Sequence, residues 1–141
     1  VMTLHACDTA TDYALASAIK SNAKVILSVP CCQHELNQTV KTVSDDAINA
    51  MLKYGIVRER FFALATDVMR CELLKENGYS VQLMEFIDME NTPKNLLIRA
   101  VQKSDTMQNS KNLLNSNYSE IENLIGSEIT LSRLLKKSGE N

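Results

Sequence analysis

The sequence predicts an α/β fold, and three observations support this prediction. Two apolar runs of strand-forming residues, 1–4 and 24–29, flank a segment with apolar residues at helical spacing. A strand–helix–strand crossover is nearly always right-handed, which makes its two strands parallel. Reactive side chains follow each strand at once, and ligands of open α/β sheets bind at the carboxyl edge. We therefore expect a sheet with a site where these two strands end.

Composition limits the classes of protein to consider. A chain of 141 residues with a 45% hydrophobic fraction is long enough for one domain with a core. Its net charge of −2 argues against a general polyanion-binding surface. No apolar run approaches the roughly 20 residues that span a bilayer, so we expect no membrane association. Four cysteines, two of them adjacent, do not make a disulfide framework, and they favour a reducing, cytoplasmic location.

The first half of the chain holds the predicted crossover. Residues 9–12 fit a capping box, with Asp12 in place of the commoner Glu, so a helix should begin there and end near Asn22. Asp8 is an alternative N-cap residue for it. The next strand, 24–29, should end at Pro30, which cannot donate to a sheet ladder. A polar stretch then leads to a short helix from about residue 44, which Gly55 should end.

The second half contributes a long helix and two further strands. Apolar residues at helical spacing predict a helix over 57–77, followed by a strand over 79–87. A turn at 91–95 and a strand at 96–101 should form an antiparallel hairpin with it. Residues 104–117 are rich in Ser, Asn and Gln and suggest a linker or surface loop. Two helices should follow within a tail at 118–141, one before Gly126 and one ending near Lys137.

Four sequence blocks resemble one family of methyltransferases. They are Leu4-His-Ala-Cys-Asp8 with the helix that follows it, Ser28-Val-Pro-Cys-Cys-Gln-His34, Leu64-Ala-Thr-Asp67 and Thr92-Pro-Lys-Asn95. The family is of the class I, Rossmann-like, S-adenosylmethionine-dependent kind, and includes the methyltransferase-like region of the glutathione S-transferase C-terminal-domain-containing protein. The resemblance covers residues 1–103. It implies an incomplete Rossmann-like sheet, strands four to seven of seven with the last strand antiparallel, plus flanking helices and a C-terminal helical tail.

The chain departs from this family in one respect. Such enzymes hold the cofactor on a glycine-rich turn after their first strand and on an acidic residue after their second. This chain has only four glycines, and none follows a predicted strand that leads into a helix. Because the chain also starts with Val1 rather than Met, we expect it to be the substrate-side half of the enzyme, inactive alone. Its expected partner is the missing N-terminal half, and the S-adenosylmethionine site is expected only in the full-length protein.

The resemblance also implies roles for the residues at the two strand ends. Four consecutive residues should line the methionine end of the cofactor: Leu4, His5, Ala6 and Cys7. Four side chains are candidates for catalysis, since they could orient or deprotonate a nucleophile: His5, Asp8, Cys31 and His34. Five residues should face the methyl acceptor, which could be RNA or protein: Pro30, Cys31, Cys32, Lys94 and Asn95.

Simpler roles compete with several of these. His5 could be a hydrogen-bonded core histidine, and Lys94 with Asn95 could merely shape the hairpin turn. The cysteines could pack as small residues, act as a redox pair or bind a metal in a non-catalytic α/β module. The spacing is not that of ordinary zinc sites, so we assign no metal from the sequence.

An unpaired first strand has a further consequence. An edge strand exposes backbone N–H and C=O groups that can pair with another chain. We therefore expect this chain to self-associate, with residues 1–5 paired to the same strand of a second copy. The alternative is that the tail folds back over this edge.

Overall fold

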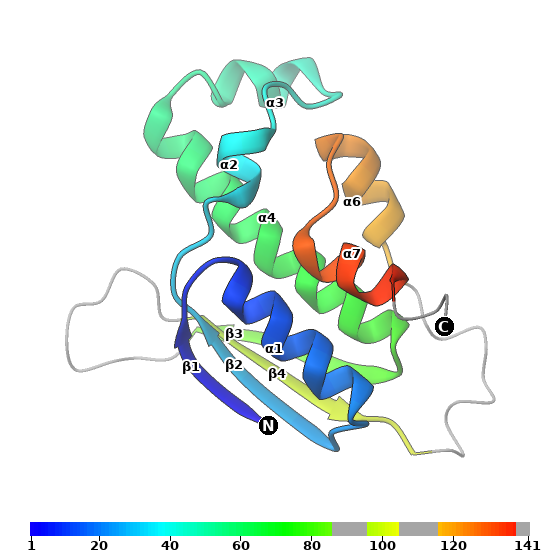
Figure 1. Ribbon diagram of the computed structural model, residues 1–141. Helices are drawn as coiled ribbons and strands as arrows, with labels where there is room; N and C mark the ends of the chain where they lie inside the picture. The colour runs from blue at the N-terminus through cyan, green and yellow to red at the C-terminus, as the bar shows by residue number, and fades with distance from the viewer. Residues whose placement is uncertain (86–95, 105–115, 138–141) are drawn as a thin grey trace.

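A computed structural model describes residues 1–85, 96–104 and 116–137, apart from the side chain of His5. The chain is a mixed α/β structure with helices beside a four-stranded sheet (Figure 1). The strands are β1 (Met2–Ala6), β2 (Val25–Pro30), β3 (Tyr79–Glu85) and β4 (Leu96–Gln102). The helices are α1 (Thr9–Lys20), α2 (Glu35–Thr39), α3 (Asp46–Met51), α4 (Gly55–Glu76), α6 (Tyr118–Ile125) and α7 (Thr130–Lys136). None of the described helices is both long and apolar enough to cross a bilayer.

The sheet has the strand order β1-β2-β4-β3. β1 and β2 are parallel, as the crossover predicted, and Met2 pairs with Leu27. β4 lies between β2 and β3 and is antiparallel to both, with Ser28 opposite Ile98. The predicted hairpin of the last two strands is therefore confirmed. β1 is an edge strand of the described sheet. Because β1 and β2 are parallel, their carboxyl ends lie next to each other at one end of the sheet.

One face of the sheet carries the core. In Figure 1, α1, α4 and α7 lie on the same side of the strands. Ile26, Ser28, Ile98 and Ala100 point to that side and are fully buried. The opposite face carries the alternate residues, and here burial is incomplete: the exposed fraction is 64% for Met2, 63% for Leu4 and 43% for Val25. Parallel strands are normally covered on both faces, so the exposure of these apolar residues on the β1–β2 pair is unusual.

The helices confirm most sequence expectations and correct two. The short and the long helix are present, but Gly55 is the first residue of α4 rather than the end of α3. The expected capping box is wrong: Thr9 lies inside α1, the N-cap residue is Asp8, and Asp8 makes no side-chain capping bond. The predicted turn at 91–95 lies outside the described residues.

The last two helices join the same core as the sheet. Tyr118, Ile125, Ile129 and Leu131 are buried in one hydrophobic cluster with residues of α1 and α4. α6 ends at Gly126, which adopts the left-handed φ of 74° that a glycine helix end favours. α7 packs against α1, so the C-terminal segment stabilises the helices that support the β1 and β2 ends.

Candidate functional site

The candidate site is the edge where β1 and β2 end. Two backbone hydrogen bonds tie the segments that follow these strands: Asp8 N–H donates to the Cys32 carbonyl at 2.8 Å, and Cys31 N–H donates to the Ala6 carbonyl at 3.4 Å. Thr11 Oγ1, in the first turn of α1, donates to the same Ala6 carbonyl at 2.8 Å. The reactive residues after both strands are thus held together, as the parallel arrangement predicted.

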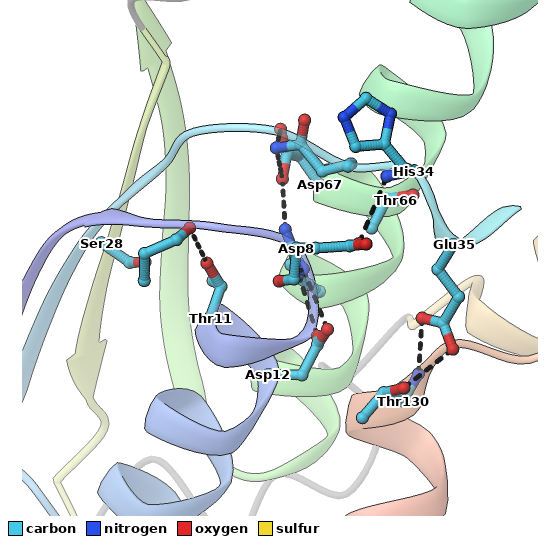
Figure 2. Close-up of polar contacts among 12 residues, drawn as sticks. Asp8, Thr11, Asp12, Ser28, His34, Glu35, Thr66, Asp67 and Thr130 are labelled. Atoms are coloured by element: carbon cyan, nitrogen blue, oxygen red, sulfur yellow. Dashed lines mark hydrogen bonds and ion pairs between the residues drawn. The ribbon is translucent and has the colours of Figure 1, made fainter. Parts of the chain in front are cut away.

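Asp8 occupies a strained backbone conformation at this edge. Its φ is 47° and its ψ is −123°, which fits the second residue of a type II′ turn, a position that favours glycine. The turn is closed by the hydrogen bond from Ala10 N–H to the Cys7 carbonyl at 3.1 Å. The Asp8 carboxylate accepts a hydrogen bond from the backbone N–H of His34 at 3.2 Å (Figure 2). Strain of this kind is concentrated at functional sites.

A buried arginine on α4 forms hydrogen bonds with the segment that follows β1. Arg70, on α4, has only 1% of its side chain exposed and forms two 2.9 Å hydrogen bonds with the carboxylate of Asp12. It also donates to Asp67 at 3.0 Å and to the Asp8 carbonyl at 3.0 Å. Gln33 extends this network, because its amide donates to both carboxylate oxygens of Asp67 at 3.0 and 2.9 Å. The network connects α4, α1 and the segments after both strands (Figure 2).

Burial and charge shift the pKa values of Asp12 and Arg70 in opposite directions. Burial raises the pKa of Asp12, although the hydrogen bonds and the charge of Arg70 lower it. Burial alone would lower the pKa of Arg70, but its bonds and charge interactions with Asp12 and Asp67 raise it above the usual value. A fully desolvated ion pair is stable only when its hydrogen bonds are well formed, and these are.

Three thiols meet at the surface of the same edge. The Sγ atoms of Cys7, Cys31 and Cys32 all lie within 4.8 Å of one another. Cys7 is exposed, the other two are half-buried, and all three are free thiols. Hydrogen bonds with the thiols of Cys32 and Cys31 raise the pKa of Cys7 to about 11. Cys71 lies apart from them in the core, where burial raises its pKa to about 12.

The structure brings some of the predicted site residues together and leaves others apart. Cys7, Asp8, Cys31 and Cys32 adjoin one another at this edge, and Ala6 contributes its carbonyl. His34 is exposed, and its backbone N–H donates a hydrogen bond to the Asp8 carboxylate. Pro30 is a buried last residue of β2. The side chain of Leu4 lies on the open apolar face of the sheet rather than at the edge.

Three of the predicted residues cannot be placed at the site. Lys94 and Asn95 lie outside the described residues, and so does the side chain of His5. The backbone of His5 belongs to β1. Their expected roles therefore stay predictions.

The sequence reasoning missed the network that supports the site. The capping-box pattern places Asp12 at the start of a helix, and no local pattern indicates a role for Arg70. They are separated by 58 positions in the chain, so no local pattern pairs them. One signal was present: a carboxylate and an arginine on helix faces that are otherwise apolar require partners when they are buried.

A comparison with protein families matches the segment that contains the ends of β1 and β2. A family model described as a methyltransferase domain matches residues 1–39, which comprise β1, α1, β2 and α2. The match therefore includes both strand ends and every residue of the thiol group. No curated protein and no solved structure matches the chain. The matched segment supports a methyltransferase domain.

Proposed function

We propose that this chain is the substrate-side half of a class I methyltransferase that uses S-adenosylmethionine. The observation that carries the proposal is the position of the family match, which coincides with the β1–α1–β2 unit that builds the candidate site. The sheet adds support, since a class I sheet ends in an antiparallel strand and β4 is antiparallel to both of its neighbours. On this proposal residues 1–103 hold strands four to seven of the enzyme, and residues 118–141 form its tail.

The cofactor-side half is the partner that this proposal requires. β1 has a free edge in the described sheet, and on one face of the β1–β2 pair the apolar residues Met2, Leu4 and Val25 are exposed. A preceding set of strands and helices would pair with that edge and cover those residues, as is usual for parallel strands. It would also supply the glycine-rich turn for the cofactor. In its absence, pairing of β1 with a second copy is the expected substitute.

The residues at the carboxyl ends of β1 and β2 suit the two tasks of such a half, which are to line the cofactor and to orient the methyl acceptor. The backbone from Leu4 to Cys7 would line the methionine end of the cofactor, with His5 among them. The Asp8 carboxylate stands at the surface and could accept a proton or a hydrogen bond from the methyl acceptor. Cys31 and His34 are the remaining candidates for orienting it, and RNA and protein acceptors both suit the proposal. Methyl transfer depends chiefly on positioning and desolvation, which the anchored segments would provide.

The test is a calorimetric titration with S-adenosylmethionine and with its demethylated product. The 141-residue chain alone should show no heat of binding. The full-length protein that contains it should bind both ligands. Absence of binding by the full-length protein would refute the cofactor assignment, and binding by the isolated chain would refute the division into halves.

The free thiols agree with the reducing, cytoplasmic location that we include in this proposal.

A further inference from the structure

The thiols at the carboxyl edge form a group that methyl transfer does not require. Cys7 follows β1, and Cys31 and Cys32 follow Pro30 at the end of β2. Their Sγ atoms lie within 4.8 Å of one another. The sequence distance between Cys7 and the pair is spanned by the whole crossover helix, so only the fold brings the three sulfurs together. We propose that Cys7, Cys31 and Cys32 bind one zinc ion as three thiolate ligands.

The geometry of the group fits such an ion. Three sulfurs at about 2.3 Å from a tetrahedral zinc stand about 3.8 Å apart, so each pair here must close by no more than about 1 Å. Rotation of exposed or half-buried cysteine side chains can provide that movement. Because Cys7 is exposed, the ion has a path of entry. Thiolate ligands select soft or borderline cations, which favours zinc over magnesium or calcium.

The backbone around the sulfurs is held in place before any metal binds. The N–H of Asp8 is bound to the carbonyl of Cys32, and the carbonyl of Asp8 is bound to buried Arg70. Cys31 N–H is bound to the Ala6 carbonyl. Each cysteine is therefore next to, or part of, an anchored peptide group. Such fixation lowers the conformational entropy that ligands lose on binding.

The number of ligands defines the kind of zinc site. Structural zinc sites use four protein ligands, whereas a site with three protein ligands keeps a fourth position for water or another small ligand. The described part of the chain brings three such side chains together here. The inferred site is thus an open one, at the edge where a methyl acceptor is proposed to bind, but it does not depend on methyltransferase activity.

The direct test is metal binding by the reduced 141-residue chain. A chromophoric chelator in competition should report one zinc ion per chain. The Cys7→Ser, Cys31→Ser and Cys32→Ser variants should each weaken the affinity by at least about 100-fold, since even loss of a residue that only orients a ligand costs 10–100-fold. Cys71→Ala is the matched control, because it removes a cysteine outside the group and should leave the affinity unchanged. Circular dichroism should report that each variant is folded.

A second measurement needs no variant. Alkylation of the unsubstituted chain followed by mass spectrometry should label Cys7, Cys31 and Cys32 without zinc and spare all three with zinc. Substitution with Co²⁺ should add the absorption of sulfur-to-cobalt charge transfer. Failure of the folded, reduced chain to bind zinc would overturn the proposal. So would zinc binding that leaves the three thiols open to alkylation, or that persists in the Cys7→Ser and Cys32→Ser variants.

Discussion

Replacement of Arg70 by Met should remove the anchor beneath the site at a large cost in stability. Arg70 makes four hydrogen bonds: two to buried Asp12, one to buried Asp67 and one to the half-buried Asp8 carbonyl. The substitution fills similar volume but leaves the Asp12 carboxylate, of which 0% is exposed, without the guanidinium. Breaking a buried ion pair by removing one partner costs about 3–5 kcal/mol. For a chain of this size, that lowers the midpoint of thermal unfolding by on the order of 10 °C.

Urea unfolding at pH 7, followed by circular dichroism, measures this loss. The matched control is Arg133→Met, the same substitution at an ion pair with Glu35 in which the arginine side chain is 43% exposed. It should cost at most about 1 kcal/mol, because solvent screens the exposed guanidinium and Glu35 keeps its two hydrogen bonds from Thr130. A loss for Arg70→Met as small as that of the control would refute the structural account of the network.

The pH dependence gives this prediction a second check. The folded chain holds the Asp12 proton to a higher pH than the unfolded chain, since burial raises the pKa of Asp12. Asp12 thus destabilises the fold as pH rises through its folded pKa. Arg70 lowers that pKa, so its removal raises it further and moves this destabilisation toward neutral pH. The deficit of Arg70→Met relative to the unsubstituted chain should therefore be smaller at pH 5 than at pH 8, and an equal deficit would contradict the charge argument.

Three further substitutions follow from the backbone and the open edge. Asp8→Gly should be more stable than Asp8→Ala by about 1 kcal/mol in urea unfolding, because Ala keeps the strained φ that Gly tolerates; equal stabilities would contradict the turn assignment. Gly126→Ala should cost about 1 kcal/mol through its positive φ alone, since no atom beyond its chain neighbours lies within 4 Å of the added Cβ; an unchanged midpoint would be inconsistent with the left-handed helix end. Leu4→Lys should shift the chain from self-associated to monomeric in gel filtration with light scattering, because a charge on an edge strand opposes pairing; a monomer before the substitution would exclude self-association through β1.

The sequence predicted the local and topological features of the fold well. The apolar runs and the crossover rule were sufficient for parallel β1 and β2, and therefore for the convergence of Cys7 with Cys31 and Cys32. The close succession of the last two predicted strands in the sequence indicated their antiparallel pairing. These features depend on neighbouring residues or on a handedness rule, so a single sequence contains enough information for them.

Features that depend on distant partners were not predictable in this way. Asp12 fits a capping box locally, but Arg70 draws its carboxylate into the core instead. Gly55 can end one helix or begin the next, and in the structure it is the first residue of α4. The five-residue helix α2 has too few residues for an apolar period, and its Glu35 is fixed by Thr130 of α7, 95 positions away (Figure 2).

Photochemical crosslinking of S-adenosylmethionine to the full-length protein would test the central proposal most directly. Labelled peptides would be identified by mass spectrometry after proteolysis. The account predicts label within residues 2–8 or 30–34, at the ends of β1 and β2, and loss of that label when the demethylated product competes. Crosslinks confined to other regions, or none above the level of a denatured control, would contradict the assignment of this edge to methyl transfer.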